Sequence, residues 1–182
     1  MVGLVARASP CEVKRTFLLA LEVLESISGL SLLESEPTED ILKKWSALSN
    51  SMLKAIIVYH TVYGNTGKAA EAICEGVKEA SVEVMCKNLK DAKPEDTLPF
   101  ELILLGAPTH YGGVPKEMDS FIKGLRSLNP KGKRGAAFDT RYEGEEKGAL
   151  DSVEKAMREM GMKIVSSGLS IKVVGGEGPL VV

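Results

Sequence analysis

Apolar residues change their spacing along the chain in a way that predicts alternating strands and helices from residue 52 onward. Residues 54–60 (KAIIVYH) form a continuous apolar run, which predicts a strand covered on both faces. Residues 82–89 alternate between apolar and polar positions and predict a second strand nearer the sheet edge. Between them, residues 67–80 carry one apolar helical face, made of Ala69, Ala70, Ile73 and Val77.

The same alternation continues to residue 174. Residues 100–110 and 134–142 are apolar runs that predict a third and a fourth strand. Residues 163–174 predict a fifth strand, interrupted at Ser167 and Gly168. Helices are predicted over residues 115–125 and 149–162, with buried stripes formed by Met118, Phe121, Ile122, Leu125, Leu150, Val153, Met157 and Met160.

Five strands that alternate with helices predict an α/β fold with right-handed crossovers. The expected architecture is a doubly wound, five-stranded parallel sheet. In such open sheets, ligands bind beyond the carboxyl ends of the strands, where the strand order reverses.

The first fifty residues follow a different pattern. One amphipathic helix is predicted from a stripe of Val13, Phe17, Leu21, Leu24 and Ile27. A second is predicted from residue 38 to about residue 53, with Trp45 and Leu48 inward. We therefore divide the chain into a helical N-terminal extension (residues 1–51) and an α/β domain (residues 52–182).

Composition narrows the classes of protein that fit. The 182 residues are 44% hydrophobic and 26% charged, an ordinary globular profile, and the net charge of −2 argues against nucleic acid as a partner. No apolar run reaches the length needed to span a membrane, and the N-terminus lacks a secretory signal. Cys11, Cys74 and Cys86 have no metal-ligand spacing and suit the reducing cytoplasm, so we expect no metal site.

The segment HTVYGNTGK (residues 60–68) joins the first strand to the first helix and concentrates hydroxyl and amide groups at the helix start. Free N–H groups and the helix dipole favour an anion there. Thr61 and Thr66 add hydroxyl donors, and Gly64 allows a close backbone approach. The turn itself holds no Lys or Arg, which suits a buried monophosphate better than Mg-ATP. A capped helix start that binds nothing fits the same residues.

Two motifs carry a resemblance to a known family. TVYGNT resembles the phosphate loop of the flavodoxins, Ser/Thr-x-Thr/Tyr-Gly-Asn-Thr, and LLGAPTHYGGVPKEMDSFI resembles their segment after strand 3. The similarity extends from about residue 52 to residue 180. It implies the strand order 2-1-3-4-5, the cofactor FMN, and a site formed by the loops after strands 1, 3 and 4.

The resemblance also implies roles for individual residues. The phosphate of FMN would be held by the first loop: Thr61, Val62, Tyr63, Gly64, Asn65 and Thr66. The isoalloxazine ring would lie along the second loop, with His110 or Tyr111 stacking and glycines that let a backbone carbonyl turn toward the flavin: Pro108, Thr109, His110, Tyr111, Gly112 and Gly113. The third loop would border the ring, with Tyr142 as a second stacking residue: Phe138, Asp139, Thr140, Arg141 and Tyr142. Each of His110, Tyr111 and Tyr142 also fits an ordinary exposed loop residue, and His60 fits a structural histidine.

The sequence departs from the family at three points. Flavodoxins place a long helix after strand 5, whereas this sequence reads GGEGPLVV there. The family has no counterpart to the extension before residue 52. The third loop carries Arg141, and no acidic residue follows Tyr111, which predicts a less negative reduction potential than is typical.

These observations predict a cytoplasmic FMN-binding electron carrier that acts between redox protein partners. The flavin would supply the chemistry, so no catalytic acid or base is expected. One alternative is an FMN-dependent NAD(P)H:quinone oxidoreductase, and another is an interaction module of the same fold without a cofactor. The apolar stripe of the extension would either cover the sheet or form a homodimer.

Overall fold

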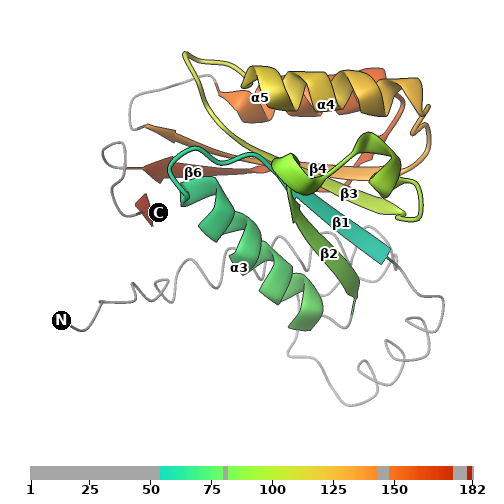
Figure 1. The fold of residues 1–182 in the computed structure, drawn as a ribbon, viewed down its shortest axis with the longest axis horizontal. Coiled ribbons are helices and arrows are strands. Elements are labelled where there is room, and N and C mark those ends of the chain that lie inside the picture. Colours follow the sequence, from blue (N-terminus) through green and yellow to red (C-terminus); the bar gives the residue numbers. More distant parts are fainter. Residues whose placement is uncertain (1–53, 80–81, 143–147, 174–179, 182) are drawn as a thin grey trace.

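A seven-stranded β-sheet forms the centre of the computed structural model, which describes residues 54–79, 82–142, 148–173 and 180–181 (Figure 1). Its order is β2-β1-β3-β4-β6-β7, with β5 also paired to β4. The strands are β1 (Lys54–Tyr59), β2 (Glu83–Asn88), β3 (Leu102–Pro108), β4 (Arg134–Tyr142), β5 (Lys163–Ile164), β6 (Leu169–Val173) and β7 (Leu180–Val181). The helices predicted before residue 52 lie outside the described residues.

The predicted parallel order 2-1-3-4-5 is confirmed, with one addition. The predicted fifth strand consists of β5 and β6, which both pair with β4 in parallel. It is interrupted before β6, where Gly168 adopts a φ of 68°, a left-handed conformation that favours glycine. The short strand β7 pairs antiparallel with β6 and was not predicted, because two residues carry no periodic signal.

Helices cover both faces of the sheet (Figure 1). α3 (Asn65–Glu79) lies on one face, and α4 (Lys116–Ser127) and α5 (Ala149–Glu159) lie on the other. α3 begins two residues before the predicted start, because the Lys68 N–H already donates to the Gly64 carbonyl at 3.0 Å. α5 ends before Gly161, whose φ of 76° stops the helix.

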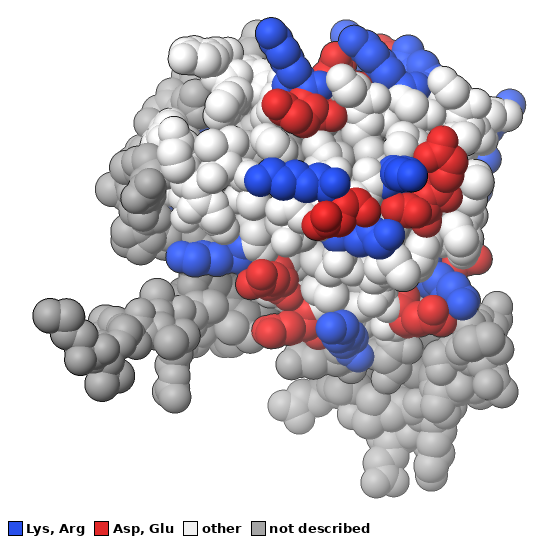
Figure 2. All heavy atoms as spheres, in the orientation of Figure 1, with Lys and Arg blue, Asp and Glu red and all other residues white. Residues whose placement is uncertain are grey.

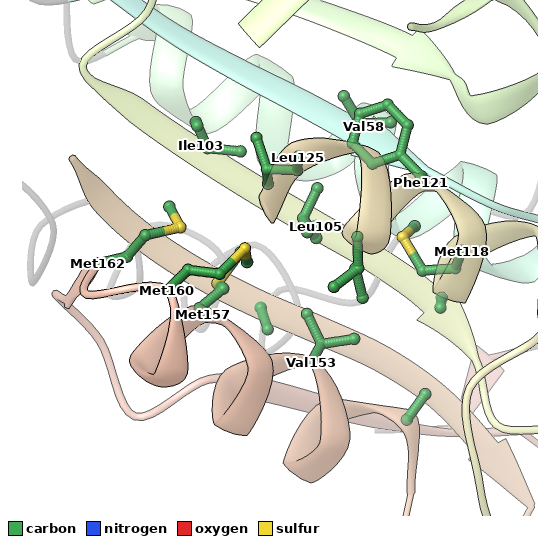
Figure 3. Packing of buried hydrophobic residues seen from close by; sticks show 14 of the residues in the cluster. Val58, Ile103, Leu105, Met118, Phe121, Leu125, Val153, Met157, Met160 and Met162 are labelled. Carbon is green, nitrogen blue, oxygen red and sulfur yellow. The ribbon is translucent and has the colours of Figure 1, made fainter. Parts of the chain in front are cut away.

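The pleat of the strands sends alternate side chains to the two helical layers. Ile56 and Val58 of β1 face α4 and α5, while Ala55 and Ile57 face α3. Figure 3 shows the larger cluster, in which the predicted stripes of α4 and α5 meet β1 and β3. The predicted stripe of α3 is likewise buried against the other face.

Gly106 and Phe138 are directly paired across β3 and β4. The Phe138 ring occupies the space in which Gly106 would carry a side chain, since a Cβ built there would lie 2.0 Å from the ring. Phe138 is fully buried, and its ring fills the space beside Gly106 in the part of the core that packs against α3.

The connection from β2 to β3 carries two short 3₁₀ turns, Leu89–Asp91 and Pro94–Thr97. Lys133, just before β4, fixes its end. Its ammonium group donates to the carbonyls of Thr97, Leu98 and Phe100 at 3.3, 2.8 and 2.6 Å. One cation therefore satisfies three carbonyls that lead into β3.

The surface shows no separation of charge on the face drawn in Figure 2, where basic and acidic side chains are interspersed. Several of the described charges pair, such as Arg126 with Glu159 at 3.0 Å and Lys123 with Asp119 at 2.7 Å. Within the described ranges, no helix combines the length and apolar character that a membrane span requires.

Candidate functional site

A pocket lies beyond the carboxyl ends of the central strands, where the strand order reverses between β1 and β3. All three predicted loops and the end of β6 contribute to it. Its lining consists of Thr61, Val62, Tyr63, Asn65, Thr66, Pro108, Thr109, His110, Thr140, Arg141, Tyr142 and Val173.

The first loop is held in a tight turn at the start of α3. The Gly64 N–H donates to Thr61 Oγ1 at 3.0 Å, and Gly64 has a φ of 87°. The amides of Asn65, Thr66 and Gly67 come next, and none of them has an acceptor among the described residues. Such free first-turn amides, aligned with the helix dipole, form an anion site.

Thr66 joins the first loop to the third. Its Oγ1 lies 2.7 Å from Thr140 Oγ1 of β4, and both residues are almost completely buried. Both also line the pocket. Two hydrogen-bonded threonines therefore form part of the pocket wall at the start of α3.

The second loop forms a tight hairpin. The N–H of His110 donates to the Gly113 carbonyl, and the N–H of Gly113 donates to the His110 carbonyl, both at 2.9 Å. Tyr111 and Gly112 between them have φ values of 48° and 75°, as in a type I′ turn. His110 lines the pocket, whereas the Tyr111 side chain is fully exposed at the tip of the turn.

The third loop contains a buried carboxylate. Asp139 is 0% exposed, and its Oδ2 accepts hydrogen bonds from Thr109 Oγ1 at 3.1 Å and the Leu150 N–H at 3.2 Å. Thr109 Oγ1 in turn accepts from the Ala149 N–H at 2.9 Å. These bonds tie the ends of β3 and β4 to the N-terminus of α5, where a negative charge is favoured.

Arg141 lies beside this carboxylate. Its Nε is 3.4 Å from Asp139 Oδ1 and bonds to Ser170 Oγ of β6. A Cβ at Gly148 would lie only 2.2 Å from Asp139 Oδ2, so glycine allows the chain to pass close to the carboxylate. The positive charge of Arg141 is therefore balanced by the carboxylate of Asp139, which lies beneath the pocket.

His60 lies at the end of β1 on the α4 side and does not line the pocket. It is 9% exposed, its Nε2 is 4.0 Å from Glu117 Oε2, and its Nδ1 is buried with no partner among the described residues. Burial lowers the pKa of His60, and nearby Glu117 opposes this effect in part. His60 is thus a buried residue outside the pocket lining, and its structural role stays a prediction.

The structure brings together most of the predicted site residues, but not all of them. Gly64, Tyr111, Gly112 and Gly113 shape the first two loops without lining the pocket, and Phe138 and Asp139 lie beneath it. Sequence reasoning missed Val173, Ser170 and Gly148. Of these, only Val173 could have been predicted from the sequence, because it lies near the carboxyl end of a predicted strand, where ligands of this fold bind.

The pocket suits a ligand with one anionic end and one flat, apolar part. The anionic end fits the free amides and hydroxyl groups at α3. Exposed apolar side chains gather in the loops around the pocket, since Val62, Tyr63, Tyr111 and Tyr142 are 47%, 57%, 104% and 43% exposed. Among the described residues, no group of His, Cys, Asp and Glu is arranged to hold a metal ion. FMN, with its phosphate and its isoalloxazine ring, matches both parts.

Comparison with known proteins assigns the family. A family model described as a flavodoxin domain matches residues 56–166. The solved structure of a flavodoxin from the domain Archaea superposes with a TM-score of 0.62 at 34% identity, over 69% of this chain and 88% of that one.

Two curated relatives extend the comparison. An uncharacterised protein of Methanocaldococcus jannaschii is 31% identical over 136 residues, which is 71% of this chain and 34% of the relative. The chain thus spans about a third of that relative's length. An NAD(P)H dehydrogenase (quinone) of Acidovorax ebreus is 28% identical over 141 residues, 63% of this chain and 70% of the relative. On the match to the family model and the shared fold, the chain belongs to the flavodoxin family.

Proposed function

We propose that this chain binds FMN in the pocket and carries electrons between redox proteins. The observation that carries the proposal is the first loop, where the amides of residues 65–67 have no acceptor among the described residues and Thr66 lines the same pocket. Bound FMN would supply the redox chemistry, since the flavin accepts and returns electrons.

The residues of this chain would hold and surround the cofactor. The first loop would bind the phosphate with neutral donors only, because it contains no Lys or Arg. His110 from the second loop and Tyr142 from the third would flank the ring, and both line the pocket. Arg141 would lie near the ring with its charge balanced by Asp139, so we expect a smaller effect on the reduction potential than an unpaired arginine would have.

Phosphate recognition can be tested with two ligands that differ only in that group. In Thr61→Ala/Thr66→Ala, the loop loses the acceptor that holds the Gly64 amide and one pocket hydroxyl. Hydrogen bonds to charged groups contribute about 1.5–3 kcal/mol each, so we expect FMN to bind tens of times more weakly, with little change for riboflavin. Flavin fluorescence quenching measures both affinities.

A matched control for the loss of a buried threonine is Thr97→Ala. Thr97 is 1% exposed and donates to the Pro94 carbonyl at 2.7 Å, away from the pocket. We expect this variant to bind FMN normally. Equal losses of FMN and riboflavin affinity in the double variant would contradict phosphate binding by the first loop. If the wild-type protein binds neither flavin, the proposal fails and the alternative of an interaction module without a cofactor is favoured.

A second candidate function is FMN-dependent reduction of quinones by NAD(P)H. It is favoured by the similarity to the NAD(P)H dehydrogenase (quinone) of Acidovorax ebreus. The FMN-loaded protein separates the two functions: an enzyme would oxidise NADPH continuously when benzoquinone is added, whereas an electron carrier would need a separate reductase.

A further inference from the structure

Thr140 and its neighbour Asp139 point to opposite faces of the sheet from the end of β4. Asp139 meets the N-terminus of α5, and Thr140 meets Thr66 in the first turn of α3. Thr140 is 4% exposed and Thr66 is 1% exposed, and the two Oγ1 atoms are 2.7 Å apart. This contact links residues 74 positions apart in the sequence.

The two hydroxyl groups share a limited number of protons. Each hydroxyl donates one hydrogen bond, and at 2.7 Å one of the two must donate to the other. If Thr66 donates to Thr140, the proton of Thr66 is unavailable to a ligand. If Thr140 donates to Thr66, the Thr66 proton is free to point into the pocket.

A dianionic phosphate in the first loop selects the second arrangement, because it accepts hydrogen bonds and has no proton to donate. Thr66 then donates to the anion and accepts from Thr140, so the two bonds form a chain in which each strengthens the other. The side chain of Thr140 has no other hydrogen-bond partner among the described residues, so nothing there competes for its proton.

We propose that Thr140 is a positioning residue for the phosphate site, which acts by donating its hydroxyl proton to Thr66 and so directing the Thr66 proton at the phosphate. This inference rests on the proposed binding of FMN. It assigns to β4 a part in phosphate recognition that is separate from its place beside the ring.

The test is a double-mutant cycle with FMN and riboflavin as probes. Thr140→Val keeps the shape of the side chain and removes its hydroxyl. Loss of one hydrogen bond of about 0.5–1.5 kcal/mol predicts FMN binding about twofold to tenfold weaker, with riboflavin affinity unchanged. Thr66→Val should have a larger effect. Thr66→Val/Thr140→Val should bind FMN no more weakly than Thr66→Val alone, because Thr140 acts only through Thr66.

A second pair of variants controls for folding and packing. Thr140→Ser and Thr140→Ala both remove the methyl group of the threonine, but only Thr140→Ser keeps the hydroxyl. We therefore expect near-wild-type FMN affinity in Thr140→Ser and weaker FMN binding in Thr140→Ala. Thermal unfolding without flavin measures any loss of stability in each variant.

The outcomes separate this inference from the proposed function. If Thr66→Val weakens FMN binding while the variants at Thr140 do not, or if the two losses add in the double variant, the positioning role is wrong and FMN binding stands. If Thr66→Val has no effect, or if the wild-type protein does not bind FMN, phosphate recognition at this loop and the role of Thr140 are both wrong.

Discussion

Single residues at the end of β4 organise the pocket through partners that are distant in sequence. Asp139 bonds to Thr109 and Leu150, while Thr140 bonds to Thr66. The alternation of a strand predicts that neighbours face opposite sides, but it does not say which helix each side chain will meet. For this reason, the sequence indicated both residues as site residues and could not separate the buried carboxylate from the hydroxyl that lines the pocket.

His60 gives a prediction about pH. Burial lowers its pKa from the ordinary value of 6.5, so the folded state favours the neutral ring and the unfolded state binds the proton more readily. The associated stability is present above about pH 6.5 and is lost as the pH falls toward the lowered pKa. Glu117 opposes the shift, whereas His110 and Lys90 add to it.

We therefore expect His60→Gln to flatten the decline in the free energy of unfolding below about pH 6.5. Urea denaturation at a series of pH values measures this decline. The chain has only one other histidine, the exposed His110, so His110→Gln is the matched control. It removes one smaller cause of the lowered pKa of His60 and leaves burial, the largest cause, so this variant should keep most of the wild-type decline. A decline of the same size in His60→Gln and wild type would show that another group is responsible.

At the scale of elements, Lys133 fixes the approach to β3. Its ammonium group donates to three carbonyls, and Lys133→Met would keep the aliphatic part while leaving those carbonyls without this donor. Hydrogen bonds to a charged donor of this kind contribute about 1.5–3 kcal/mol, so we expect about 2 kcal/mol lower stability, with a lower urea midpoint. Lys155→Met, on the exposed side of α5, should leave the midpoint unchanged. Equal midpoints for both variants would contradict the role of Lys133.

Long elements with a clear period could be predicted from the sequence. β4 occupies the predicted residues 134–142, and the buried side chains of α4 are the four of its predicted stripe. The features that the sequence did not predict depend on a few backbone angles or on pairing between strands. The helical hydrogen bond to Gly64 starts α3 early, and β7 exists through its pairing with β6. No local period encodes such features.

For the whole molecule, the prediction concerns the face of the sheet that carries α3. α3 is the only described helix on this face (Figure 1). Leu169 and Ile171 of β6 are half-buried there. The predicted stripe of residues 13–27 would add apolar cover, at about 25 cal/mol per Å² buried. A chain that begins at Met52 should therefore unfold at a lower temperature, and calorimetry measures the difference. An unchanged melting temperature with an unchanged monomeric state would contradict both packing on the sheet and dimerisation.

The relation between Gly106 and Phe138 limits how this family member can diverge. A methyl group on residue 106 would require the space that the Phe138 ring already fills, and a smaller side chain at 138 would leave a void beside glycine. Each single replacement is therefore costly, while a larger residue at 106 together with a smaller one at 138 restores the volume. Related sequences should therefore carry either glycine at the position of residue 106 with an aromatic residue at the position of residue 138, or a larger residue at the first position with a smaller one at the second. A lineage that changes from one pair to the other by single replacements must pass through a less stable protein.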